Sequence, residues 1–297
     1  MAIQEPMRLF FVINPVSGGK KKADPVTMVE NYFRDRPETI HIFQLDKQLP
    51  PTAIKSAIKD FKPDAVVAVG GDGTVKLVAE QLLNAKIPMG ILPAGSANGM
   101  ATELGIPEDW AQALEVILKG HIRQIDAIRV QDKGICIHLG DIGLNALLVK
   151  NFEQRGIRGK AGYALSSIKT FWQRQLLDVQ VENASLRVTK KAFMIVLANA
   201  RMYGTGVCIN PDGNLGDGLF EVVILRQLSV IELFKMVFRH RPFDPRKTEV
   251  IQASNVIITT RKKAHFQIDG EYLGKVKQVK AEILPQALKI LTPHTLA

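Results

Sequence analysis

The sequence has few cysteines, few aromatic residues and no long hydrophobic run. Its two cysteines, Cys136 and Cys208, lie far apart in apolar segments. This argues against a disulfide scaffold or a cysteine-rich zinc site and favours a reducing compartment. Apolar runs such as Ala65–Val69 and Phe193–Ala198 are far shorter than the ~20 residues of a membrane-spanning helix. We therefore expect a cytoplasmic protein that meets a membrane only from outside.

Positive charge is in excess. The 297 residues contain 39 Lys and Arg against 29 Asp and Glu, a formal net charge of +10. Such a balance favours an anionic partner such as a nucleotide or a phospholipid surface. Aromatic residues make up only 6% of the chain, too few for a platform that stacks bases, so we expect no specific nucleic acid partner.

The first 127 residues alternate between apolar strand-like runs and helical spacing. Near-continuous apolar strands that alternate with helices predict a parallel sheet covered on both faces. The predicted strands are Leu9–Ile13, Ile40–Phe43, Ala65–Val69 and Met89–Leu92, and the predicted helices are Val26–Arg34, Thr52–Asp60, Val75–Leu83, Ala97–Leu104 and Trp110–Leu118.

After residue 127 short strand-like runs dominate. Turn residues separate several of them, which predicts a mostly antiparallel β domain. Two helices, Ala161–Leu176 and Val230–Phe238, are predicted to be inserted into it. The predicted strands are Ile135–Leu139, Leu186–Thr189, Phe193–Leu197, Leu219–Leu225, Glu249–Thr260, Ala264–Ile268 and Val276–Ile283.

Three turns rich in glycine and small polar residues follow predicted parallel strands. They span Asn14–Gly19, Gly70–Val75 and Pro93–Gly99. The carboxyl ends of parallel strands share one sheet edge, so these turns should converge, and their glycines let backbone N–H groups approach a phosphate. None matches the Walker A or G-x-G-x-x-G pattern. Asp72 could hold Mg²⁺, receive a proton or only cap the following helix.

The motifs of these turns resemble the diacylglycerol kinase catalytic family, which includes bacterial soluble lipid kinases and the sphingosine and ceramide kinases. They read Asn14-Pro15-x-Ser17-Gly18, Gly-Gly-Asp-Gly-Thr at 70–74, and Pro93-x-Gly95-Ser96-x-Asn98. Two later segments, Asn214–Leu219 and Ile268–Glu271, also fit. The resemblance implies an ATP- and Mg²⁺-dependent kinase that phosphorylates a hydroxyl of a diacylglycerol- or sphingoid-like lipid.

The resemblance also implies the architecture. Residues 1–127 would form a three-layer α/β nucleotide-binding domain with a parallel sheet. Residues 128–285 would form a lipid-binding, mostly antiparallel β-sandwich with inserted helices, and residues 286–297 would return to the first domain. We expect peripheral membrane association while the enzyme acts on its lipid acceptor, and leave open a homodimer.

Residue roles follow from the same resemblance. Glu271 would accept the proton of the lipid hydroxyl with Asp269 beside it, and Asp72 would act near the phosphates, directly or through Mg²⁺. A second Mg²⁺ would be held by Asp217 with the backbones of Asn214 and Leu219. The residues implied to bind ATP are Asn14, Pro15, Val16, Ser17, Gly18, Gly70, Gly71, Asp72, Gly73, Thr74, Val75, Ser96 and Asn98.

Other interpretations stay open at this point. Asp269-Gly270-Glu271 is also a common hairpin turn, and the apolar stripe of Ala161–Leu176 fits core packing as well as an acyl chain. A NAD kinase shares the Gly-Gly-Asp-Gly-Thr turn. Many bacterial members of the family have an aspartate where this chain has Gly99, so an inactive nucleotide-binding regulator is a third hypothesis.

Overall fold

The computed structural model describes residues 5–16, 24–46, 50, 52–147, 149, 176–203, 207–227 and 244–294. The chain forms two compact units, one of Met1–Ile125 with Ala287–Ala297 and the other of Asp126–Gln286. The predicted domain boundary at 127 lies beside this division, and the predicted return of 286–297 overlaps the end of the first unit.

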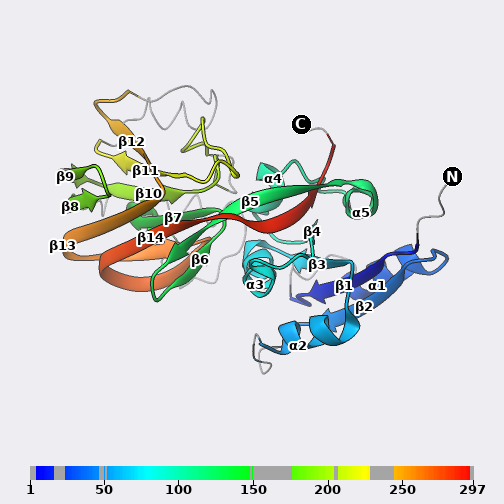
Figure 1. The fold of residues 1–297 in the computed structure, drawn as a ribbon. Coiled ribbons are helices and arrows are strands. Elements are labelled where there is room, and N and C mark those ends of the chain that lie inside the picture. The colour runs from blue at the N-terminus through cyan, green and yellow to red at the C-terminus, as the bar shows by residue number, and fades with distance from the viewer. Residues whose placement is uncertain are drawn as a thin grey trace. The chain divides into compact units, whose positions relative to one another are not determined.

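The first unit contains a parallel sheet with the strand order β2-β1-β3-β4, and the end of β14 lies beside β4 (Figure 1). Its central strands are entirely buried, which explains their unbroken apolar sequences. The strands are β1 (Arg8–Ile13), β2 (Thr39–Gln44), β3 (Ala65–Gly70) and β4 (Met89–Pro93), with Ala287–Thr292 from the end of β14.

Helices cover both faces of this sheet. Neighbouring strand residues point to opposite faces, and Phe11 packs on Phe33 of α1 whereas Phe10 packs on Phe61 of α2. On β4, Gly90 leaves space that Ile117 of α5 fills. The helices are α1 (Pro25–Phe33), α2 (Thr52–Phe61), α3 (Asp72–Leu82), α4 (Gly99–Glu103) and α5 (Trp110–Lys119). The predicted three-layer α/β architecture is confirmed.

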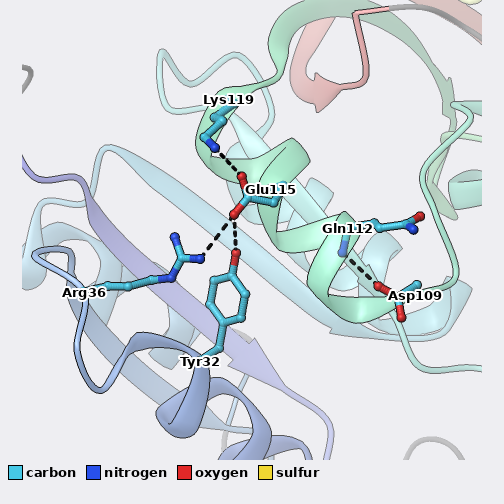
Figure 2. A network of polar contacts seen from close by, with 6 residues as sticks. All are labelled: Tyr32, Arg36, Asp109, Gln112, Glu115 and Lys119. Atoms are coloured by element: carbon cyan, nitrogen blue, oxygen red, sulfur yellow. Dashed lines mark hydrogen bonds and ion pairs between the residues drawn. The ribbon is translucent and has the colours of Figure 1, made fainter.

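A polar network joins α1 to α5 through Glu115 (Figure 2). Its carboxylate accepts a hydrogen bond from the Tyr32 hydroxyl at 2.7 Å and lies 2.6 Å from Lys119 Nζ and 3.2 Å from Arg36 Nη2. The hydrogen bonds from Lys119 and Tyr32 and the two positive charges lower the pKa of Glu115 to about 2. Burial and the neighbouring Glu115 raise the pKa of Tyr32 to about 12.

The second unit is an antiparallel β-sandwich, as predicted. The strand order is β12-β11-β10-β7-β13-β14, and the hairpin of β8 and β9 pairs with β13. Phe220 and Phe266 are fully buried in its core. Its strands are β6 (Gly134–Cys136), β7 (Leu139–Gly143), β8 (Leu177–Glu182), β9 (Arg187–Ala192), β10 (Met194–Ala198), β11 (Phe220–Leu225), β12 (Thr248–Ala253) and β13 (Asn255–Ile268), together with parts of β5 (His121–Val130) and β14 (Glu271–Thr292).

Two predicted strands are broken in the structure. The run Ile135–Leu139 is divided between β6 and β7, because a side chain takes the N–H groups of Ile137, His138 and Leu139. The run Glu249–Thr260 is divided at Ser254 into β12 and β13, which pair with different strands. Apolar sequence alone does not reveal such breaks.

The two inserted helices predicted at 161–176 and 230–238 lie outside the described residues, apart from Leu176. In the part of the chain that the structure does describe, no helix has the length and apolar character needed to cross a bilayer.

We predict that Glu115→Gln lowers the free energy of unfolding at neutral pH by less than about 1 kcal/mol, because the Glu115 side chain is 38% exposed and water screens its ion pairs. The folded pKa lies below the unfolded value of 4.5, so the stabilisation is present above pH 4.5. It should disappear as the pH falls towards about 2. Urea unfolding of both proteins at several pH values measures this, and a pH-independent difference would contradict it.

Candidate active site

The loops after β1 and β3 lie where the strand order reverses. The chain leaves β1 towards β2 on one side and leaves β3 towards β4 on the other. Asn14, just after β1, donates its backbone N–H to Val69 O at 3.1 Å and its side-chain amide to Thr74 Oγ1 at 3.4 Å. Open α/β sheets bind ligands at such a switch point, beyond the carboxyl ends of the strands.

The second and third loops touch through their glycines. A Cβ atom on Gly95 would lie 2.5 Å from Gly71 Cα and 2.8 Å from Asn98 Oδ1. The N–H of Ala94 also bonds to Gly70 O at 2.9 Å, and Gly95 N–H bonds to Asn98 Oδ1 at 2.8 Å. Only residues without a side chain permit this approach, so the two loops form one surface.

Asp72 lies at the start of α3 and links it to the third loop. Its Oδ1 accepts the backbone N–H of Met100 at 3.1 Å. Asn98, which precedes α4, has a positive φ of 51°, a conformation that asparagine tolerates better than most residues. The half-buried Asp72 carboxylate keeps Oδ2 without a partner among the described residues.

The first turn of α3 presents backbone N–H groups. Gly71 caps this helix without a side chain, and the N–H groups of Thr74 and Val75 bond to Gly71 O. The N–H groups of Asp72 and Gly73 have no acceptor within the helix. Such a helix start suits a phosphate. Of the other predicted ATP-binding residues, Pro15, Val16 and Ser96 are exposed, and Ser17 and Gly18 lie outside the described residues.

Both carboxylate oxygens of Asp269 accept hydrogen bonds from backbone N–H groups. Its oxygens accept N–H groups from Ile137 and His138, both at 3.0 Å, and from Leu139 at 3.1 Å. The thiol of Cys136 lies 3.3 Å from Oδ1. Asp269 is 9% exposed, and a cluster of N–H groups of this kind holds an anion firmly. Asp269 therefore fixes the position of the turn that it occupies.

Glu271 is exposed and begins β14 directly after this turn. Ile268 pairs with Glu271, and Asp269 and Gly270 have φ values of 52° and 83°. Positive φ at both central residues is typical of a tight hairpin turn, for which Asp-Gly is a preferred sequence. The hairpin interpretation is compatible with a carboxylate that reacts, because the Glu271 side chain stays accessible at its end.

A second buried group supports the same turn. Gln267 Oε1 accepts the N–H of Gly270 at 2.8 Å, and its amide nitrogen donates to Asp141 Oδ2. Burial raises the pKa of Asp141 to about 6, against the hydrogen bonds from Asn145 and Gln267. Asp141 Oδ1 has no partner among the described residues. Asp141 and Gln267 are not among the site residues predicted from the sequence, although each is a polar residue inside an apolar strand.

Asp126 fixes the backbone of the predicted metal-binding turn. This buried carboxylate accepts the N–H groups of Gly218 and Gln286, both at 2.7 Å. Asp217 is exposed and accepts the N–H of Leu219 through Oδ1 at 3.0 Å, and it has no other partner among the described residues. A carboxylate oxygen of Asp217 with the carbonyls of Asn214 and Leu219 would supply only oxygen ligands, the type that Mg²⁺ prefers. Within the described residues, no three His, Cys, Asp or Glu side chains form a metal cluster.

We predict that Gly95→Ala lowers the free energy of unfolding by about 1–3 kcal/mol, because its Cβ atom meets backbone that cannot move aside. Gly73→Ala is the matched control. Its Cβ would meet nothing within 4 Å, so we expect no change or a gain of up to ~1 kcal/mol. Thermal and urea unfolding measure both variants, and equal effects would contradict the close approach.

We predict that Asp269→Asn lowers the free energy of unfolding by about 1–3 kcal/mol. The asparagine NH₂ group would replace one of the two accepting oxygens and leave a buried backbone N–H without an acceptor. Asparagine tolerates the positive φ, so the backbone conformation is not changed. The exposed Glu271→Gln should change stability by less than ~0.5 kcal/mol. Urea unfolding of the two variants tests the structural role of Asp269.

Known proteins share both units. The model of the diacylglycerol kinase catalytic domain matches residues 8–130, and the model of the YegS C-terminal NAD kinase beta sandwich-like domain matches residues 142–292. A "Probable lipid kinase YegS-like" protein of Klebsiella pneumoniae is 27% identical over 267 residues, 89% of each chain. A Synechocystis sp. protein with no stated activity is 29% identical over 239 residues, 77% of this chain but only 54% of its own length.

The fold is also shared with a solved structure. The crystal structure of a diacylglycerol kinase from Bacillus anthracis str. Sterne superposes with a TM-score of 0.76 at 18% identity, over 99% of this chain and 100% of that chain. This similarity concerns the fold alone. The two family models cover most of the chain in consecutive order. The chain therefore belongs to the diacylglycerol kinase family of lipid kinases and is a phosphotransferase.

Proposed function

We propose that the chain transfers the γ-phosphate of ATP to a hydroxyl of a diacylglycerol- or sphingoid-like lipid, as a cytoplasmic enzyme that associates peripherally with the membrane. The observation that supports this best is the meeting of three strand-end loops at the switch point of the first unit, with Gly71 against Gly95. At this place the start of α3 offers the N–H groups of Asp72 and Gly73, which have no acceptor within the helix, to a triphosphate.

Asp72 is the acidic group of this phosphate site. Its Oδ1 accepts the N–H of Met100, which fixes the carboxylate and leaves Oδ2 for a ligand. One carboxylate oxygen with phosphate oxygens is a typical environment for Mg²⁺, which would neutralise charge that develops on the phosphates. Asp217 with the carbonyls of Asn214 and Leu219 would hold a second Mg²⁺ in the other unit.

Glu271 is the proposed general base. Phosphoryl transfer needs a carboxylate that accepts the proton of the attacking hydroxyl. Glu271 is exposed, whereas the Asp269 carboxylate is saturated by three backbone N–H groups. We therefore assign proton transfer to Glu271 and the positioning of the hairpin to Asp269 and Gln267.

We predict that Glu271→Gln reduces lipid phosphorylation at least about 100-fold, the usual contribution of a general base, while ATP binding is retained. Radiolabelled ATP with a mixed lipid extract, or with NAD, measures transfer, and equilibrium dialysis measures binding. The unfolding free energy, which Glu271→Gln should leave unchanged, controls for misfolding.

The same assay separates the alternatives. A labelled product in the organic phase supports the lipid kinase, and mass spectrometry then identifies the lipid. Labelled NAD would instead identify a NAD kinase, and ATP binding without any transfer would identify a nucleotide-binding regulator. Normal turnover by Glu271→Gln would overturn the assignment of the base.

A further inference from the structure

Strand β13 carries three consecutive exposed cations where it changes partners. Its first half pairs with β8 and its end pairs with β7. Thr259 pairs with Gln278 of β14, and Ala264 pairs with Val276. Four residues of β13 therefore lie opposite the single residue of β14 between these two pairs. The extra length forms a bulge that contains Arg261, Lys262 and Lys263, all exposed. Bulges of this kind bend a strand and redirect its side chains.

Two hollows flank the bulge. One, of about 220 Å³, is lined by Leu176, Leu177, Asp178, Thr260, Arg261 and Lys262. The other, of about 80 Å³, is lined by Lys263 and Lys275 together with leucines that include Leu177. Because Leu177 lines both, the hollows adjoin. We call Arg261, Lys262, Lys263 and Lys275, with Leu176 and Leu177, the basic bulge surface.

The charge of this surface is largely uncompensated. Asp178 Oδ2 lies 4.0 Å from Arg261 Nη1 in an exposed pair. The side chains of Lys262, Lys263 and Lys275 have no ion pair among the described residues. Four cations and one carboxylate leave a net charge of +3. Leu176 is 45% exposed beside these cations, so an apolar side chain accompanies the charge.

We propose that the basic bulge surface binds the anionic surface of a lipid bilayer. The inference rests on the proposed function, because a lipid acceptor resides in a membrane. Lysines next to an exposed leucine are typical of interfacial membrane binding, in which cations meet lipid phosphates and apolar side chains enter the acyl boundary. A single-stranded nucleic acid would require aromatic platforms, and among the described residues that line the two hollows only His265 carries a ring.

The surface belongs to the same hairpin as the proposed base. Glu271 and Lys275 are four residues apart on β14, about 13 Å along an extended strand. Lys275 pairs with His265 on β13, two residues after Lys263. A bilayer bound at the basic bulge surface would therefore lie near the end of the hairpin that carries Glu271.

The test compares two triple variants in co-sedimentation with vesicles of equal parts phosphatidylglycerol and phosphatidylcholine. In the first, Lys262, Lys263 and Lys275 are replaced by serine. The matched control replaces Lys133, Arg246 and Lys280, which are exposed residues of the same unit outside the basic bulge surface, and removes the same charge. A cation at an anionic membrane contributes about fivefold to partitioning, so the first variant should bind at least about tenfold more weakly. The control should stay within about twofold of the unchanged protein.

The outcomes distinguish a failure of this inference from a failure of the proposed function. The inference is supported if only the first variant loses vesicle binding and if none of the proteins binds vesicles of pure phosphatidylcholine. Equal binding by both variants, an equal loss in both, or no vesicle binding by the unchanged protein overturns it. The inference is also overturned if the first variant binds vesicles normally but no longer binds a single-stranded RNA. A protein that binds vesicles as expected but phosphorylates no lipid in detergent micelles overturns only the proposed function.

Discussion

The contact between the backbones of Gly71 and Gly95 is the constraint on which the candidate active site depends. Parallel strands deliver their loops to one edge of a sheet, but side chains normally keep neighbouring loops apart. Here two residues without side chains let the loops after β3 and β4 touch. Asp72 then reaches the N–H of Met100. The start of α3 consequently opens onto a surface formed by several loops rather than one.

In the second unit, buried polar side chains fix the position of the hairpin turn that carries the exposed Glu271. The Asp269 carboxylate and the Gln267 amide together take four backbone N–H groups around a single hairpin. A buried carboxylate is costly unless hydrogen bonds compensate it, so this arrangement resists rearrangement. The turn is therefore firmly positioned although Glu271 at its end is exposed. The basic bulge surface lies further along the same pair of strands.

Much of this architecture follows from local sequence. Continuous apolar runs such as Ala65–Val69 identify fully buried parallel strands, and Asp269-Gly270 identifies a tight hairpin. The prediction was wrong where an apolar run is interrupted by a distant side chain. Ile135–Leu139 reads as one strand, but Asp269, more than a hundred residues later, takes the N–H groups that would have continued it.

The sequence by itself determined the alternation of strands and helices in the first unit up to α5, the edge at which the small-residue loops gather, and the set of carboxylates available for chemistry. Strand polarity and side-chain periodicity are local properties, and they are legible in the chain. Only the tertiary structure decided how each carboxylate is used. Asp269 is saturated by backbone N–H groups while Glu271, two residues later, is exposed, because burial and hydrogen-bond partners come from segments distant in sequence.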